Sequence, residues 1–184
     1  MGKLSSFTFI TLNGHFKGPG EDTSWHNHSN AAGKFANKAS QSASILLFGR
    51  KTYEMMAAFW PTEMAAKLFP VVAANMNKAQ KIVCSKKLKK ADWNNTTILK
   101  GDIVTEIKKL KRRKTEITIL GSGSLITQLT DAGLIDQYSI MLDPVAIGKG
   151  ASIFDGIKNN LELKLTSSKV FKKDSILVLT YAKK

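Results

Sequence analysis

The sequence predicts an α/β domain built on a mostly parallel β-sheet with an antiparallel edge. From residue 45 to residue 142, short apolar segments rich in Val, Ile, Leu and Phe alternate with segments of helical periodicity. Two β-type segments then close the chain around a polar turn, which is typical of a hairpin. Neither an internal repeat nor a linker divides the 184 residues, so we expect one domain over residues 1–184.

Strands are expected where short apolar runs meet turn residues. The expected strands are 6–12, 45–48, 81–84, 97–99, 117–120, 138–142, 161–171 and 176–181. Helices are expected between them, because apolar side chains recur at helical spacing and capping residues mark the ends. The expected helices run from a cap at Ser29 or Asn30 to about Ser42, from near Lys51 to before Pro61, from 62 to 69, from a cap at Asp102 through Leu110, and from a cap at Ser122 or Ser124 to Gly133.

The charge is strongly positive, with a formal net charge of +14. Residues 78–114 hold thirteen Lys or Arg against three acidic residues. A basic face can attract nucleic acid or a small phosphate compound, or it can simply be solvated. Because Trp93 is the only aromatic residue in this segment and no nucleic-acid-binding motif occurs, we expect no nucleic-acid partner.

The sequence has the composition of a soluble globular protein. No apolar run approaches the length of a membrane span, and no signal-peptide pattern occurs, so we expect no membrane association. The single cysteine, Cys84, cannot form an internal disulfide, which is consistent with a reducing compartment. The expected location is cytoplasmic.

Three junctions between a strand and a helix or turn carry small, hydroxyl and cationic residues. They are FGRKT at 48–52, CSKK at 84–87 and LGSGSL at 120–125. In an open α/β sheet, ligands bind at the carboxyl ends of the strands. Three such ends along one edge would suit a molecule with phosphates spread along its length, because Arg50, Lys51 and Lys86 supply positive charge.

The sequence GSGS at 121–124 has two interpretations. Gly121 and Gly123 remove side chains, so the backbone can approach a ligand, and the N–H groups of the following helix favour an anion. Alternatively the glycines only satisfy the backbone angles of a tight turn. The pattern is not the dinucleotide fingerprint G-x-G-x-x-G, since Ile126 occupies the last glycine position. The expected ribose-binding acid is also lacking, because Asp143, at the right distance, runs directly into Pro144.

The order and spacing of five segments resemble the dihydrofolate reductase-like superfamily. These segments are TLNGHFKGPGEDTSW, LLFGRKTYEMMAAFWP, KIVCSKKL, ITILGSGSLITQL and GLIDQYSIMLDPVAIGKGASIF. Within that superfamily the chain is most similar to the reductase domain of bacterial riboflavin biosynthesis and its relatives. The resemblance covers nearly the whole chain. It implies a three-layer fold with an eight-stranded, mostly parallel sheet and an antiparallel C-terminal hairpin, NADPH as cofactor, and a homodimer.

The resemblance also implies roles for particular residues. It assigns cofactor binding to Thr11, Gly49, Arg50, Lys51, Thr52, Ser85, Lys86, Gly121, Ser122, Gly123, Ser124 and Leu125. Arg50 would lie near the adenosine 2′-phosphate, and 121–125 would hold the pyrophosphate. The resemblance therefore implies that GSGS is a phosphate-binding turn. The two interpretations are then compatible, because the same glycines also satisfy the backbone angles of the turn.

The loop 11–25 would cover the nicotinamide and the substrate, for which Asn13, Trp25 and Asn30 are the candidate contacts. Two acidic residues typical of the relatives are missing. Dihydrofolate reductases carry a carboxylate a few residues after the loop tryptophan, whereas no Asp or Glu occurs between Trp25 and Gln41 here, and Asn30 lies near the expected place. The riboflavin branch often has an aspartate where this chain has Asn13, which cannot titrate. We therefore do not expect true dihydrofolate reduction.

His15, His26 and His28 share the opening loop. They could supply a proton donor or a metal site, or they could be solvated. No cysteine or further histidine accompanies them, so we expect no metal.

Two functions remain after these observations. The first is an NADPH-dependent reductase, and thus an oxidoreductase, acting on a small pterin- or pyrimidine-like heterocycle of the riboflavin-pathway type. The second is a non-catalytic nucleotide-binding protein on the same fold.

Overall fold

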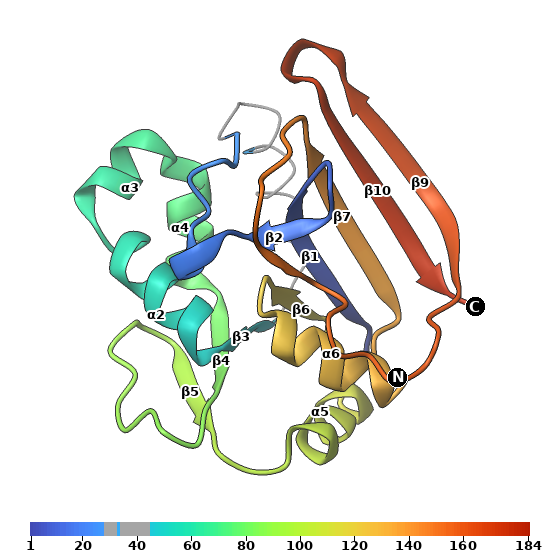
Figure 1. The fold of residues 1–184 in the computed structure, drawn as a ribbon. Coiled ribbons are helices and arrows are strands. Elements are labelled where there is room, and N and C mark those ends of the chain that lie inside the picture. Colours follow the sequence, from blue (N-terminus) through green and yellow to red (C-terminus); the bar gives the residue numbers. More distant parts are fainter. Residues whose placement is uncertain (28–32, 34–44) are drawn as a thin grey trace.

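A computed structural model describes residues 1–27, 33 and 45–184 of the chain. An eight-stranded sheet has the order β5-β4-β3-β6-β1-β7-β10-β9 and is parallel from β5 to β7. Strand β10 is antiparallel to both β7 and β9. The predicted parallel sheet with an antiparallel C-terminal hairpin is therefore confirmed (Figure 1).

The strands lie close to where the apolar runs predicted them. Their bounds are β1 Leu4–Thr11, β2 His15–Lys17, β3 Ile45–Gly49, β4 Gln80–Cys84, β5 Thr96–Leu99, β6 Ile117–Leu120, β7 Gln137–Asp143, β8 Ala151–Ser152, β9 Leu163–Phe171 and β10 Ile176–Lys183. The short strands β2 and β8 pair with each other outside the main sheet. The sequence did not predict them, because two or three residues are too few to show a period.

Helices connect the parallel strands. Their bounds are α2 Arg50–Phe59, α3 Glu63–Leu68, α4 Pro70–Lys78, α5 Ile103–Arg112 and α6 Gly123–Asp131, with short 3₁₀ turns η1 Pro19–Glu21 and η2 Lys172–Asp174. The Asp102 carboxylate caps α5 by accepting from Thr105 N at 2.8 Å, as predicted. Helix α4 was not predicted. It begins at Pro70, a residue tolerated at the first helical position, and buries Ala73 and Met76. The helix expected from Ser29 or Asn30 to Ser42 lies outside the described residues.

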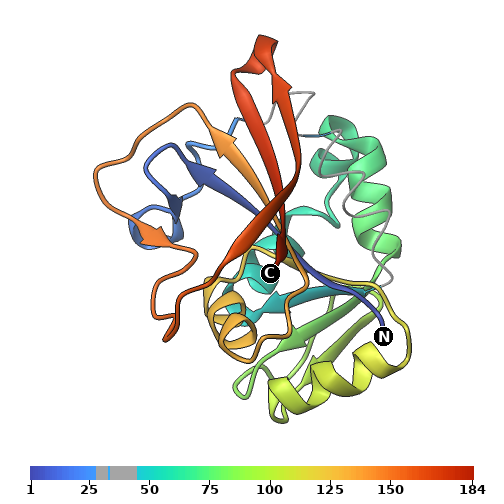
Figure 2. The same ribbon diagram turned by 90° about the vertical axis from the view of Figure 1, so that its right-hand side faces the viewer.

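Two apolar cores, one on each face of the sheet, give the three layers. One core joins α5 and α6 to the sheet through Ile107, Ile126 and Leu129. The other joins α2 and α4 to the opposite face through Tyr53 and Met76. The hairpin of β9 and β10 extends beyond the rest of the sheet (Figure 2). This arrangement leaves the carboxyl ends of β3, β4 and β6 side by side at one edge, where the three predicted junctions meet.

Two lysines of the basic segment 78–114, where a solvated face was one interpretation, are buried. Lys81 is 1% exposed, and its ammonium donates to the carbonyls of Met76, Asn77 and Ala79 at 2.8, 3.2 and 2.7 Å. It therefore satisfies the carboxyl end of α4. Lys111 is 7% exposed and pairs with Asp136 at 2.6 Å, which ties α5 to the segment before β7.

In the described part of the chain, no helix is both long and apolar enough to cross a bilayer.

Candidate active site

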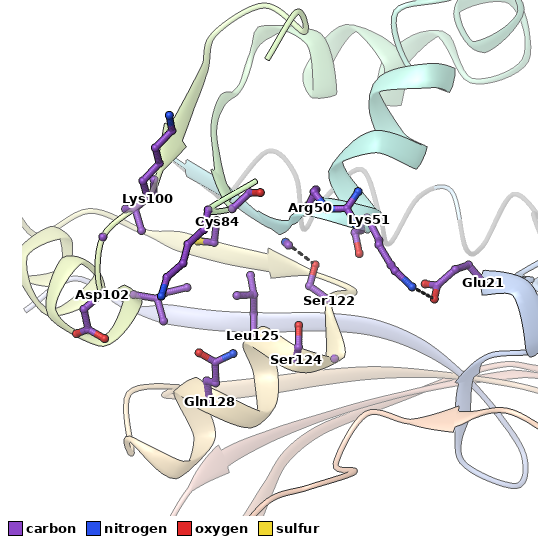
Figure 3. A pocket seen from close by; sticks show the side chains of 18 of the residues that line it. Glu21, Arg50, Lys51, Cys84, Lys100, Asp102, Ser122, Ser124, Leu125 and Gln128 are labelled. Carbon is purple, nitrogen blue, oxygen red and sulfur yellow. Dashed lines mark hydrogen bonds and ion pairs between the residues drawn. The ribbon is translucent and has the colours of Figure 1, made fainter. Parts of the chain in front are cut away.

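A cavity of about 600 Å³ lies at the shared edge of β3, β4 and β6 (Figure 3). Gly49 and Cys84, the last residues of β3 and β4, are register partners, and Ile119 of β6 pairs with Leu47 of β3. The sheet therefore places the three junctions around one space. Of the predicted cofactor contacts, the cavity is lined by Gly49, Arg50, Lys51, Thr52, Ser85, Lys86, Ser122, Gly123, Ser124 and Leu125.

The turn between β6 and α6 needs both of its glycines. Gly121 has a φ of +55° and the next residue, Ser122, a φ of +63°. Two successive left-handed residues reverse the backbone sharply, and such a conformation is strained for most side chains. At Gly123 the constraint is space, since an added Cβ would lie 2.8 Å from Cζ of Phe16. The turn interpretation of GSGS is thus satisfied, and the backbone of the turn still lines the cavity.

The prediction that the side chain of Ser122 or Ser124 caps α6 is wrong, although Ser122 does occupy the position before the helix. Its hydroxyl accepts from Gly49 N at 2.9 Å and donates to Leu120 O at 3.1 Å, so it ties the end of β3 to the end of β6. Its left-handed backbone accounts for this, because capping by a side chain requires an extended residue at that position. No described side chain caps α6. Gly123 and Ser124 therefore bring the uncapped, electropositive start of the helix to the cavity wall.

Two cations that line the cavity, Arg50 and Lys51, form ion pairs with carboxylates. Arg50 Nη1 lies 2.7 and 2.8 Å from the two Glu54 oxygens, and Lys51 Nζ lies 2.9 Å from Glu21 Oε1. Glu21 also pairs with Lys17, and the two lysines, Lys17 first, lower the pKa of its carboxyl group. The Arg50–Glu54 and Lys51–Glu21 pairs are exposed, and exposed pairs contribute at most about 1 kcal/mol. An incoming phosphate can therefore take the place of either carboxylate.

Lys100 lines the same cavity and was not predicted. It directly follows β5, the strand next to β4, so the same strand-end argument would have found it. Cys84 also lines the cavity, but burial raises the pKa of its thiol to about 12. The thiol stays protonated at neutral pH, and Cys84 is therefore not a nucleophile.

The polar cavity continues into two apolar ones. A space of about 380 Å³ is lined by Thr8, Thr52 and Gly121, and a further space of about 480 Å³ by Trp25, Phe59 and Trp60. Phe16 lines all three spaces. We call the row of three adjoining spaces the cleft; cations line its first space and aromatic side chains line its third.

Two buried polar atoms along the apolar part of the cleft lack a partner. They are Thr8 Oγ1, in a residue 4% exposed, and Trp25 Nε1, and neither has a hydrogen bond in the described part of the chain. Buried polar groups are nearly always hydrogen-bonded, so each of these atoms calls for an explanation. A polar ligand in the cleft would supply both partners.

Thr11 and Asn13 line none of these spaces. Thr11 is fully buried, and its hydroxyl donates to Asn13 Oδ1 at 2.8 Å and accepts from His15 N at 3.0 Å. Asn13 in turn exchanges two hydrogen bonds with the backbone of Ile147. Thr11 therefore orders the loop after β1, and Asn13 fixes that loop to the segment after β7. Asn30 lies outside the described residues.

A pairing that the sequence did not predict joins His26 to Asp143. His26 Nδ1 lies 3.0 Å from Asp143 Oδ2, and Asn27 N donates to Asp143 Oδ1 at 2.9 Å. From the sequence, Asp143 stood only at the spacing of a ribose-binding acid, a role that the adjacent Pro144 disfavours. Its place as the last residue of β7, at the same edge as Gly49 and Cys84, was the signal available. No group of three metal-binding side chains occurs among the described residues.

Comparison with known proteins finds relatives in sequence and in overall fold. The chain is 26% identical over 163 residues to the uncharacterised protein YyaP of Bacillus subtilis (strain 168), covering 88% of this chain and 85% of YyaP. A protein of Shewanella sp. PV-4, assigned provisionally to riboflavin biosynthesis, superimposes with a TM-score of 0.78 at 21% identity and 99% coverage of both chains.

Enterococcus faecalis dihydrofolate reductase, solved in complex with NADP(H) and RAB-propyl, superimposes with a TM-score of 0.66 at 17% identity, covering 99% of this chain and 96% of that one. The predicted dihydrofolate reductase-like fold is confirmed. The family model for the RibD C-terminal domain matches residues 3–177. Because this match covers nearly the whole length, the chain belongs to the RibD C-terminal domain family.

Proposed function

We propose that this protein is an NADPH-dependent reductase of a small heterocycle of pterin- or pyrimidine-like structure. The observation that carries the proposal is the single cleft that joins a cationic end to an aromatic end through Phe16. A dinucleotide has the matching distribution of chemistry, with phosphates toward one end and an uncharged ring at the other. The solved complex of Enterococcus dihydrofolate reductase with NADP(H) supports the same choice of cofactor.

The residues of the polar cavity fit such a cofactor. Arg50 and Lys86, which both line the cavity, would hold the 2′-phosphate, and the uncapped start of α6 at Gly123 and Ser124 would hold the pyrophosphate. When bound, NADPH supplies a hydride. The aromatic space lined by Trp25 and Trp60 would take a flat heterocycle, whose polar edge can satisfy Trp25 Nε1.

A non-catalytic nucleotide-binding role is the second candidate. Its support is the absence of any Asp or Glu between Trp25 and Gln41, where dihydrofolate reductases place their carboxylate. Both candidates bind NADPH, so binding alone does not separate them. The same absence makes dihydrofolate itself a poor choice of substrate.

Two measurements test the proposal. Titration with NADPH, followed by energy transfer from tryptophan to the nicotinamide and by calorimetry, is expected to saturate in the low-micromolar range or weaker. NADPH oxidation is then measured against pterins, flavin precursors and quinones. Saturable binding without oxidation of NADPH by any of them would favour the non-catalytic role, and no binding by either method would refute both. A homodimer and a cytoplasmic location accompany the proposed reductase.

A further inference from the structure

The His26 ring forms part of the wall of the aromatic space. It is 7% exposed and stacks on Phe9 with ring centroids 3.6 Å apart and an interplanar angle of 25°. Trp25 meets it edge-on, with centroids 6.2 Å apart. Both neighbours line the same space of about 480 Å³. The imidazole is therefore held in a fixed plane against the place proposed for the substrate.

Asp143 fixes which nitrogen of that ring carries the inner proton. Its carboxylate is 0% exposed, and its two oxygens have separate donors, His26 Nδ1 at 3.0 Å and Asn27 N at 2.9 Å. An ionised carboxylate only accepts hydrogen bonds, so Nδ1 is protonated. Proton exchange with a ligand must then take place at Nε2. This is the geometry in which a carboxylate orients an imidazole for acid–base chemistry.

His26 is placed to supply a proton in this space. Among the described residues that line it, His26 is the only titratable side chain. Asp143 itself does not line the space and reaches it only through the imidazole. The carboxylate missing between Trp25 and Gln41 thus has a counterpart that the chain supplies from β7 instead.

We propose that His26 is the catalytic proton donor and that Asp143 is its positioning residue, an inference that rests on the proposed reductase function. Reduction of a C=N bond in the substrate adds a hydride to carbon, supplied by NADPH when bound, and a proton to nitrogen. The Nε2–H bond breaks, the N–H bond of the product forms, and the imidazole is left neutral with Nδ1–H on Asp143. Water then restores the proton at Nε2.

The variants His26→Gln and Asp143→Asn test the proposal, with His15→Gln as the matched control. His15 is a histidine of the same loop that lines none of the three spaces. The probes are 7,8-dihydropterin, which has a C=N bond in its ring, and a pyrimidine glycosylamine, whose ring-opened form is an imine. General acid catalysis contributes about 10²–10⁴-fold, so His26→Gln is expected to lower kcat by about 100-fold or more. Its KM and its dissociation constant for NADPH should stay within about threefold of the original values.

The pH profile separates proton donation from a purely structural clamp. If His26 donates the proton, the pH profile of kcat should change shape in His26→Gln and in Asp143→Asn, while His15→Gln keeps the original profile. A purely structural clamp predicts a different result for His26→Gln. NADPH affinity, kcat and melting temperature would all fall, while the shape of the pH profile of kcat would stay unchanged. That result would overturn the proposal.

A second measurement on the unchanged protein decides the matter if a variant fails to fold or neither probe is turned over. Histidine ¹⁵N NMR should show His26 protonated at Nδ1, and adding 7,8-dihydropterin to the protein with NADP⁺ should shift the His26 Nε2 resonance. If NADP⁺ binds and that resonance stays unchanged at millimolar dihydropterin, the His26 proposal is wrong. If neither NADPH nor NADP⁺ binds, the proposed function fails first.

Discussion

Replacing Arg50 by alanine is expected to weaken NADPH binding by about tenfold and to leave NADH binding within about twofold. The two cofactors differ by one phosphate, and Arg50 is the cation at the strand end proposed to meet it. Hydrogen bonds between charged groups contribute roughly 1.5–3 kcal/mol. Binding must first break the exposed pair with Glu54, at 2.7 Å, which is worth about 0.2–1 kcal/mol. The remainder, about 0.5–3 kcal/mol, corresponds to roughly two- to hundredfold in affinity, with tenfold near the middle of that range.

Glu54→Gln is the matched variant on the other side of the pair. It keeps the length of the side chain and removes the charge that competes with the phosphate. NADPH should therefore bind up to about fivefold more tightly, which is the affinity equivalent of the exposed pair. NADH affinity should not respond. Opposite effects of Arg50→Ala and Glu54→Gln on one cofactor would identify the pair as the place where the 2′-phosphate binds.

The assay is a fluorescence titration of each variant with NADPH and NADH at low and at physiological ionic strength. Salt matters because the net charge of +14 attracts any anion, and that diffuse attraction fades with screening while a direct contact persists. If Arg50→Ala weakens both cofactors equally, or neither, Arg50 is not the 2′-phosphate ligand. The role carried over from the family would then be wrong at this residue.

Three further predictions concern stability, the glycine turn and assembly. Burial lowers the pKa of Lys81 from 10.5 to about 8. Between these two pH values the unfolded chain therefore binds more protons than the native one. The free energy of unfolding should then rise with pH, by at most about 3 kcal/mol. Urea unfolding from pH 7 to 10.5 measures this, and the reasoning fails if Lys81→Met shows the same rise. Gly123→Ala should displace Phe16 and weaken NADPH by tenfold or more, as read by the same titration, with unchanged affinity as the contrary result. The expected homodimer should sediment at twice 20.2 kDa at micromolar concentration, and a monomer there would contradict it.

The strands were predictable because they are short apolar runs bounded by turn residues. Their ends deviate by a few residues, as at β1, which begins at Leu4 where the pattern indicated Ser6. Helix α4 was missed because Pro70 signals a break, although proline is also accepted as a first helical residue. The burial of Lys81 could not be predicted, since its three acceptors are backbone carbonyls that a side-chain pattern does not reveal.

The site was predictable to the extent that it follows from the topology. Parallel strands bring their carboxyl ends to one edge, so residues after β3, β4 and β6 had to gather there. Contacts between loops do not follow from that rule. The hydroxyl of Thr11 is used within its own loop, and His26 meets Asp143 across 117 positions of sequence. Neither arrangement leaves a local pattern, and only the folded chain shows them.

The shared walls of the cleft have a thermodynamic consequence for any two ligands that occupy it together. Phe16 borders all three spaces, and Met55 borders both apolar ones. A ligand that shifts either side chain in one space changes the wall of the next. Linkage then requires reciprocity, so the factor by which a dinucleotide changes the affinity for a heterocycle is the factor by which the heterocycle changes the affinity for the dinucleotide. That factor can be measured from either side, even before the natural substrate is identified.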